Sequence, residues 1–387
     1  MTVYLDHAAT TPLRAEAREA WLAASEEVGN PSSIHGAGQR ARRLLEDARD
    51  RLAAVLDCQP IEVVLTSGGT ESVNLALKGL WWARRDDADL VVLPDGEHHA
   101  TLDTVAWLSE HEGARVVPVA VDAEARIAPE RFGAALGPDV ALATALVANN
   151  EAGTVNDAAA LAELAASQSV PLHLDAVAAF GHVPVSFRGW RAEATGPSGL
   201  VALSVSGHKI GAPVGTGALV VSRDARVSAL LHGGGQQRSL RSGTQDVAGA
   251  TALAVAAELA EAEREAEAAR LSGLRDRVIA GVRASVPDAV LLGDPTRRLP
   301  GNIHLHLPGA PGESLLYLLD LAGIAASTGS ACQAGVPEPS HVVTAMGLDE
   351  RAARQVLRVT LGRTTVAGDV DALLAVLPDA YRRAAGL

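Results

Sequence analysis

The chain is short of lysine. Of its 33 lysine and arginine residues, only Lys78 and Lys209 are lysines. Arginine cannot act as a nucleophilic amine, because its guanidinium stays protonated in proteins. Lysine can lose its proton and bind an aldehyde cofactor covalently. Lys78 falls on a predicted helix, where we expect an ordinary surface role, so Lys209 is the stronger candidate for amine chemistry.

Cysteine is equally scarce. Cys58 and Cys332 are the two cysteines, too few for a disulfide framework. Cys58 lies in a predicted turn before an apolar run, and we interpret it as structural. Cys332 lies among small residues in the stretch 327–335, which is typical of a loop that cannot bury a thiol. An exposed thiol of this kind is a candidate nucleophile.

Excess positive charge, a targeting signal and membrane-length apolar runs are also missing. The formal charge of −13 argues against a broad nucleic-acid-binding surface, so we expect no direct contact with nucleic acid. The first residues lack the basic and apolar regions of a signal peptide, and no apolar run is long enough to span a bilayer. With 48% hydrophobic residues, these absences predict a cytoplasmic globular protein with no membrane partner.

Apolar runs alternate with helical patterns between about residues 60 and 221. The runs lack polar alternation, which predicts strands covered on both faces. Their alternation with helices predicts an α/β fold with a mostly parallel, doubly wound sheet. One of the helices, over residues 161–167, is expected to be capped by Asn156 or Asp157. The seven candidate strands are 63–66, 90–93, 116–119, 141–147, 172–174, 200–205 and 218–221.

The rest of the chain predicts a smaller α/β domain. A long helix rich in alanine, glutamate and arginine is expected over residues 248–286, with a break near Ser272. The further expected elements are strands at 302–307 and 356–361 and a helix at 313–322. The expected divisions are an N-terminal segment of residues 1–14 that packs with the small domain, a large cofactor-binding domain of 15–255, and a small domain of 256–387 that carries Cys332.

Functional side chains follow several of the predicted strands. Asp175 and Lys209 each come at a strand end, and they are the two groups that pyridoxal phosphate (PLP) requires. The carboxylate pairs with the pyridinium nitrogen and the amine holds the aldehyde. Ligands of open α/β sheets bind at the carboxyl ends of the strands. Gly69, His98 and Asn150 also follow strand-like runs, so we expect these residues to meet at one site.

A phosphate site is predicted at residues 66–72, where a strand gives way to glycines and then to a helix. Glycines allow the backbone to approach a phosphate, and the helix N-terminus offers free N–H groups to it. Ser206, His208 and Thr244 are further candidate phosphate donors. No metal site is predicted.

Two more side chains are candidates for binding the ring and the substrate. His98 could stack on the cofactor ring, and a plain polar turn is the alternative interpretation. Arg358, at the start of a predicted strand, could hold a substrate carboxylate through its two-pronged guanidinium. The alternative for Arg358 is a surface ion pair.

The ordered set of motifs resembles that of the cysteine desulfurases of the class V aminotransferase family, which have PLP fold type I. The resemblance covers essentially the whole chain, and the short segment around Cys332 is similar to that of the group serving iron–sulfur assembly and tRNA thiolation. A selenocysteine lyase, or a weakly active scaffold with the same fold, is the alternative. The motifs are residues 4–12, 29–33, 69–71, 97–98, 149–151, 206–209, 232–235, 241–244 and 327–332.

This resemblance implies how the cofactor is held. Lys209 would bind PLP covalently and move protons, Asp175 would pair with the ring nitrogen, and His98 would stack on the ring. Thr244 would reach the phosphate of the neighbouring subunit, which implies a homodimer. The other residues implied in phosphate binding are Thr70, Ser206 and His208, and Gly69 would contact the cofactor from the same turn as Thr70.

The resemblance also implies the reaction. Asn150 would reach the ring substituents or the substrate carboxylate, and Arg358 would bind that carboxylate. Cys332 would take the sulfur of L-cysteine, releasing alanine and leaving a persulfide for protein sulfur acceptors. An iron–sulfur scaffold, a tRNA-thiolating enzyme and a DNA-phosphorothioation system all remain open as acceptors.

Two features depart from the family's pattern. Three residues after the ring-pairing Asp175, the family carries a glutamine that donates to the phenolic oxygen of PLP, and this chain has Ala178. The stretch 187–200, which contains Trp190, is also longer than usual. We expect both features to change the cofactor environment.

Overall fold

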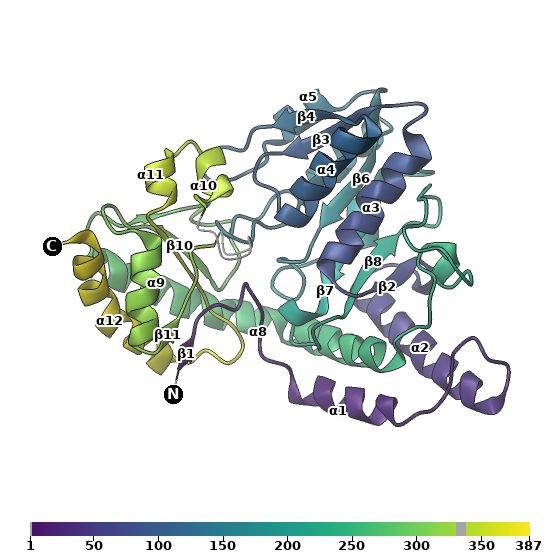
Figure 1. Cartoon of the computed structure of the whole chain (residues 1–387), viewed down its shortest axis with the longest axis horizontal. Coiled ribbons are helices and arrows are strands. Elements are labelled where there is room, and N and C mark those ends of the chain that lie inside the picture. Colours follow the sequence, from purple (N-terminus) through teal and green to yellow (C-terminus); the bar gives the residue numbers. More distant parts are fainter. Residues whose placement is uncertain (1, 330–337) are drawn as a thin grey trace.

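The structure is a computed structural model that describes residues 2–329 and 338–387. Within this part of the chain a seven-stranded sheet forms the larger lobe and a three-stranded sheet the smaller one (Figure 1). All seven predicted strands of the large sheet are confirmed. In sheet order they are β2 (Val63–Thr66), β8 (Gly217–Val221), β7 (Gly199–Ser206), β6 (Pro171–Asp175), β5 (Val140–Leu146), β3 (Leu90–Pro94) and β4 (Arg115–Val119).

The large sheet is mostly parallel, as predicted. Strand β8 is the exception, since it runs antiparallel to both β2 and β7. The continuous apolar runs are buried on both faces in β2, β5, β6, β7 and β8, as a sheet between two helical layers requires. The edge strand β4 differs, because Val116 there is 39% exposed.

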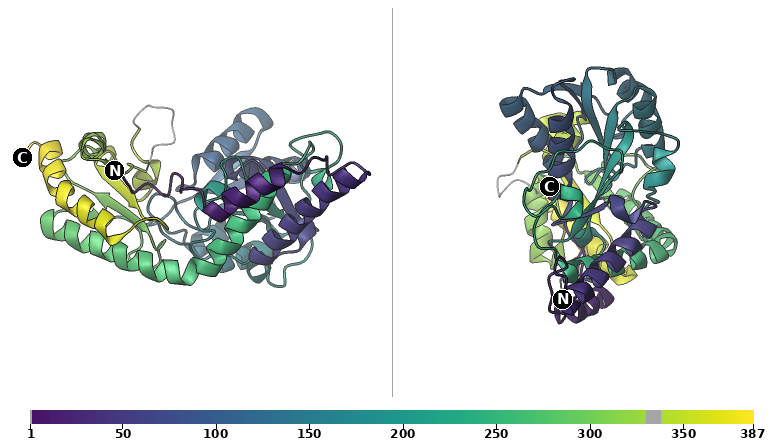
Figure 2. Two further views of the ribbon diagram at one scale, coloured as in Figure 1. Left: turned by 90° about the horizontal axis from the view of Figure 1, so that it is seen from below. Right: turned by 90° about the vertical axis from the view of Figure 1, so that its right-hand side faces the viewer.

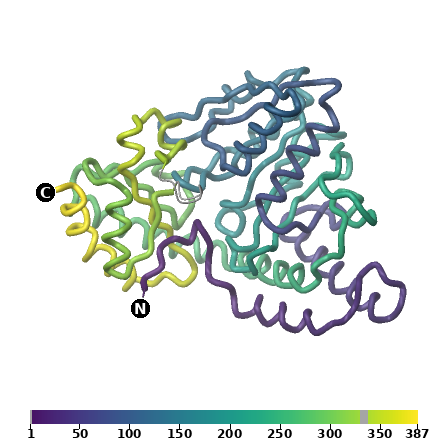
Figure 3. Tube along the Cα trace, in the orientation of Figure 1, coloured from purple at the N-terminus to yellow at the C-terminus, as the bar shows by residue number. Residues whose placement is uncertain are grey.

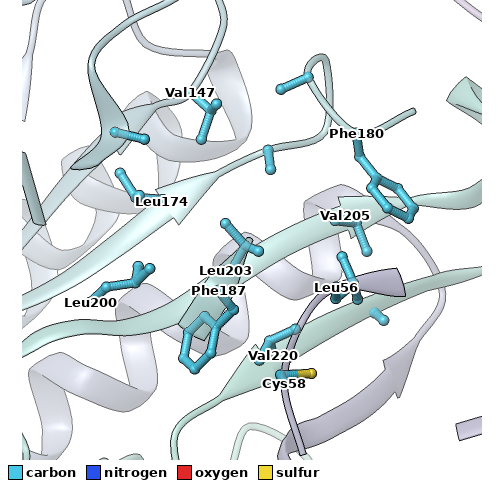
Figure 4. Packing of buried hydrophobic residues seen from close by; sticks show 14 of the residues in the cluster. Leu56, Cys58, Val147, Leu174, Phe180, Phe187, Leu200, Leu203, Val205 and Val220 are labelled. Atoms are coloured by element: carbon cyan, nitrogen blue, oxygen red, sulfur yellow. The ribbon is translucent and has the colours of Figure 1, made fainter. Parts of the chain in front are cut away.

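Helices cover both faces of this sheet. On one face, Leu77 of α3 (Gly69–Arg84) and Leu108 of α4 (His99–Glu112) belong to one buried apolar cluster. On the other face, Leu52 of α2 (Gly36–Val55) and Leu161 of α6 (Ala158–Ser167) belong to a second and larger one. Figure 4 shows part of this second cluster, with Cys58 beside Phe187 and Val220. Also in this lobe are α1 (Ala15–Ser25), α5 (Pro129–Ala135), α7 (Phe187–Arg191), and the short 3-10 helices η1 (Pro60–Glu62), η2 (Gly207–Lys209) and η3 (Gln237–Ser239).

Side chains at the helix starts fix where the helices begin. Asp157 caps α6 by accepting a hydrogen bond from the backbone N–H of Ala160, at 3.1 Å. Asn156, the other cap predicted, instead donates to the carbonyl of Leu146 and accepts from the N–H of Ile127. It therefore ties the end of β5 to its neighbouring loop.

Helix α8 (Val247–Ser285) runs through both lobes as one continuous helix of 39 residues. The predicted break near Ser272 is wrong, because the alanine, glutamate and arginine around Gly273 favour helix strongly enough to offset the roughly 1 kcal/mol that one glycine costs. Leu253 packs in the core of the larger lobe and Val278 in that of the smaller lobe. Figure 2 shows the helix extending along both lobes. The expected domain boundary at residue 255 falls inside this helix and stays a prediction.

The smaller lobe contains the predicted strands near 302 and 356 and the helix near 313. Its sheet is antiparallel, in the order β12 (Val356–Thr360), β10 (Asn302–His306) and β9 (Val290–Leu291). The N-terminal strand β1 (Val3–Tyr4) pairs in parallel with β11 (Ile324–Ala325), so the chain starts on the smaller lobe before it crosses to α1 (Figure 3). The helices here are α9 (Gly312–Leu321), α10 (His341–Ala345), α11 (Glu350–Ala353) and α12 (Ala367–Ala385).

Among residues 2–329 and 338–387, every helix is too short or too polar to cross a membrane.

Candidate active site

A pocket of about 300 Å³ lies at the carboxyl ends of the parallel strands, where the N-terminal segment and β12 come against the larger lobe. It brings together most of the predicted site residues. Thr244 does not line it, and Cys332 lies outside the described residues. The predicted residues that line it are Gly69, Thr70, His98, Asn150, Asp175, Ser206, His208, Lys209 and Arg358.

Lys209 is positioned by the turn that ends β7. The strand passes directly into η2, so the lysine side chain starts at the sheet edge. Its Nζ donates to the carbonyls of Ala8 and Ala9, the latter at 3.0 Å. The N-terminal segment thus holds the amine inside the pocket. Lys78, by contrast, lies over the ring of Trp107 on the outer helices, as expected for a lysine without a role in the site.

Asp175 is the last residue of β6 and is 3% exposed. Its Oδ1 accepts a hydrogen bond from the N–H of Val177 at 2.8 Å. Burial raises the pKa of Asp175 to about 6, although this bond and the charge of Lys209 lower it. A buried carboxylate with a raised pKa would be stabilised by a cationic partner, and a pyridinium N–H is such a partner.

His98 caps α4 and faces the same pocket. Its Nδ1 accepts from the N–H of Ala100 at 3.0 Å, which places the ring proton on Nε2. Burial, followed by the charge of Lys209, lowers the pKa of His98 to about 4. The imidazole is therefore neutral near pH 7.

The N-terminus of α3, with Gly69 and Thr70, lines another part of the same pocket. Gly68 has a φ of 147°, which favours glycine. A Cβ at Gly69 would lie 2.7 Å from Val177 Cγ2, so any larger residue there would force the Val177 side chain to move. The Oγ of Ser206 is buried and makes no hydrogen bond to any described residue. A helix N-terminus with an unused hydroxyl beside it is suited to a phosphate.

Arg358 is the third residue of β12 and is 4% exposed. The alternative interpretation for Arg358 was a surface ion pair. Arg358 does form an ion pair, but its side chain is buried and does not lie on the surface. Its Nη2 donates to Asp6 Oδ1 and its Nη1 to the carbonyl of Asn150, both at 3.0 Å. The guanidinium therefore joins the N-terminal segment, the small sheet and the loop after β5.

Thr244 lies on an exposed loop outside the pocket. Arg241 in the same loop pairs with Glu71 of α3, at 2.8 Å, so the loop stays near the phosphate end of the site. Cys58 is buried, and burial raises the pKa of its thiol to about 12. This agrees with a structural role for Cys58.

The two expected departures have different outcomes. Ala178 lines the site, and next to it a cavity of about 40 Å³ extends toward His182 and Asn302. The expectation that residues 187–200 change the cofactor environment is wrong. Residues 187–198 precede β7 and residues 199 and 200 begin it, at the opposite end of the strand from Lys209. Trp190 packs against the core of the larger lobe.

Two acidic residues next to the site, Asp6 and Glu97, had no role assigned from the sequence. Asp6 was visible in the motif at residues 4–12, yet nothing in its spacing pointed to Arg358. Glu97 was visible as a charged residue at the end of an apolar run. It is 1% exposed, its Oε1 accepts from the N–H of Leu146 at 2.8 Å, and its Oε2 makes no hydrogen bond to a described residue. Burial raises the pKa of Glu97 to about 8, and the Asp175 charge adds to the effect.

Comparisons with known proteins agree with this fold and site. The family model for aminotransferase class-V matches residues 3–373, so the chain belongs to that family. Several relatives that match over nearly the whole chain are named cysteine desulfurases, and the chain is a member of that group. The IscS-like cysteine desulfurase of Mycobacterium tuberculosis is 49% identical, with 98% of this chain and 96% of the relative covered.

Solved structures give the same result. A NifS-like protein superposes with a TM-score of 0.90 at 31% identity, covering 98% of this chain and 99% of that one. SspA in complex with cysteine superposes with a TM-score of 0.80 at 28% identity, covering 95% of this chain and all (100%) of that one.

Proposed function

We propose that this protein is a cysteine desulfurase that binds PLP in the pocket at Lys209 and converts L-cysteine to L-alanine. The observation that carries the proposal is the convergence of Lys209, Asp175, His98 and Arg358 on one pocket of about 300 Å³. Together they offer a nucleophilic amine, a buried carboxylate, a neutral ring and a carboxylate-binding guanidinium.

The described residues fit PLP. The unused Ser206 hydroxyl and the N-terminus of α3 would hold the phosphate, with Thr70 and His208 beside them. Asp175 would pair with the ring nitrogen at the other end, and His98 would cover the ring. Thr244 would serve the neighbouring subunit in a homodimer. When bound, PLP supplies an electron sink for the carbon atoms of the substrate.

The protein's own groups would do the rest. Arg358 and Asn150 would orient the substrate carboxylate, and the Lys209 amine would move the proton at the α-carbon. The thiolate of Cys332 would attack the sulfur of the bound cysteine. An S–S bond forms on Cys332 as the C–S bond breaks, and the electron pair left on carbon takes a proton to give alanine. The persulfide would then pass to a sulfur acceptor.

Cysteine fits better than selenocysteine as the substrate. The M. tuberculosis relative is named a cysteine desulfurase, and SspA was solved with cysteine. A thiol nucleophile is needed to take up sulfur as a persulfide, and Cys332 lies in a segment with the family's pattern.

The experiment is a turnover assay on the purified, PLP-loaded protein with L-cysteine, which measures alanine and Cys332 persulfide together. We expect one alanine for each sulfur passed on, and visible absorbance that changes on adding cysteine. Selenocysteine serves as the comparison. Alanine formation from selenocysteine but not from cysteine would indicate a selenocysteine lyase and overturn the proposal. If neither compound changes the absorbance, the protein is better described as a weakly active scaffold with this fold.

A further inference from the structure

The guanidinium of Arg358, which lines the pocket, already makes an ion pair with Asp6. Its Nη2 lies 3.0 Å from Asp6 Oδ1, and the exposed fractions of the two side chains are 4% and 20%. A buried cation without a counter-charge costs several kcal/mol, so the Asp6 carboxylate has a clear energetic reason to be there.

The backbone fixes this pair in place. Asp6 bridges to Thr360 of β12, and the N–H of Thr360 donates to the carbonyl of Leu5 at 2.8 Å. On the same edge of β12, Arg358 exchanges two backbone hydrogen bonds with Ser327. The two charged side chains therefore come from adjacent, hydrogen-bonded segments, so the pairing does not depend on flexible side chains finding each other.

The pairing leaves donors available. A guanidinium has five N–H groups. One is used by Asp6, another by the carbonyl of Asn150, and the Nε–H of Arg358 makes no hydrogen bond to a described residue. Since Arg358 also lines the pocket, a ligand carboxylate can bind it while Asp6 stays in place.

We propose that Asp6 is a specificity-determining residue that acts through Arg358: it neutralises the guanidinium while the pocket is empty and weakens the binding of a ligand carboxylate to it. A ligand carboxylate on Arg358 must share the cation with Asp6 and is repelled by it. This inference rests on the proposed role of Arg358 in holding the substrate carboxylate.

The two carboxylates would be a few ångströms apart. At such a separation, and at the effective dielectric of a partly buried site, like charges repel strongly enough to change an affinity by about tenfold or more. Asp6→Asn keeps an oxygen that can accept from Nη2 and removes the charge. We therefore expect this variant to bind carboxylate ligands about tenfold more tightly, and to have a lower melting temperature without ligand.

The test is a titration of PLP-loaded parent and Asp6→Asn with L-alanine, followed through cofactor absorbance. Ethylamine, which has the amine and methyl group but no carboxylate, is the second probe. We expect tighter alanine binding by Asp6→Asn and unchanged ethylamine binding. Melting of the cofactor-free proteins gives a readout that does not depend on activity. Asp379→Asn removes an exposed carboxylate that pairs with Arg382 at 3.5 Å, and serves as the matched control.

Each outcome decides something. Unchanged or weaker alanine binding in Asp6→Asn overturns the role of Asp6. Weaker binding of both probes would mean that Asp6 attracts the ligand's amine, which also overturns it. Arg358→Gln separates the two levels of inference: if it leaves alanine binding unchanged, the assignment of Arg358 fails together with this one. If it weakens alanine but not ethylamine binding, the Arg358 assignment holds and Asp6 is judged alone.

Discussion

The Nζ of Lys209 lies 3.0 Å from the carbonyl oxygen of Ala9, a residue 200 positions earlier in the chain. The N-terminal segment therefore closes one side of the pocket and points the amine into it. An arginine at this position would keep the charge and reach the same carbonyls, but its guanidinium is not nucleophilic.

Lys209→Arg should fold like the parent and lose turnover by at least about a hundredfold, because a positioned acid–base group contributes that much or more. Borohydride reduction of the PLP-loaded parent should attach the cofactor at Lys209, and peptide mass spectrometry would locate it. Lys78→Arg is the matched control and should behave like the parent. Cofactor attached at Lys78 would contradict the assignment.

The two cysteines should behave differently. Cys332→Ala should still bind PLP and cysteine, because its thiol acts only after the substrate is bound, and it should lose persulfide formation. Cys58→Ala should keep full activity, since its thiol is buried among apolar residues. It should lose about 1–2 kcal/mol of stability from the missing sulfur. Persulfide-specific labelling and chemical unfolding measure the two effects, and parent-level sulfide release by Cys332→Ala would exclude it as the acceptor.

The sequence predicted the sheet well because its strands are apolar on both faces. The first and last residues of each of the seven predicted runs lie within a residue or two of the ends of the observed strand. The polar residues that follow several of these strands line one pocket. Strand ends share an edge of the sheet, so sequence order was enough to bring Asp175 and Lys209 together. The same reasoning could not anticipate Asp6 beside Arg358, since that pairing depends on how β1 docks on β11 far along the chain.

The errors have local causes. The break predicted at Gly273 ignored how strongly its neighbours favour helix. Residues 187–200 were associated with the cofactor because the stretch is longer than usual for the family, yet they lead into β7 at the end that lies away from the site. The direction of β7 explains the position of this segment, because a segment that precedes a parallel strand lies at the end of the sheet away from the site.

Ala178→Gln should tighten PLP binding and lower the pH at which the bound cofactor changes colour. A hydrogen bond to an ionised group contributes about 1.5–3 kcal/mol, and each 1.4 kcal/mol is about tenfold in affinity. The cavity beside Ala178 gives the longer side chain room. Reconstitution of the cofactor-free protein and a spectrophotometric pH titration measure both effects.

Ala178→Leu is the matched control for that variant, because it fills the cavity without donating a hydrogen bond. It should leave the pH midpoint unchanged. If Ala178→Gln and the parent titrate alike and bind PLP equally, another group already provides the glutamine's hydrogen bond.

Glu97 should make the protein less stable as the pH rises. The pKa of its carboxyl is 4.5 in the unfolded chain and about 8 in the fold, because burial disfavours the charged form. Between these values the folded protein binds more protons than the unfolded chain, so the free energy of unfolding falls with rising pH. The contribution is complete below about pH 4.5 and is lost as the pH passes through about 8.

Glu97→Gln keeps the acceptor for Leu146 and cannot ionise. Denaturant unfolding at several pH values should therefore show parent and variant closest near pH 5 and the variant ahead by roughly 3–4 kcal/mol near pH 8. Glu163→Gln, on the exposed face of α6, should show no such difference. A constant gap between Glu97→Gln and the parent across this range would mean that Glu97 is ionised in the fold, with a partner that the described residues do not provide.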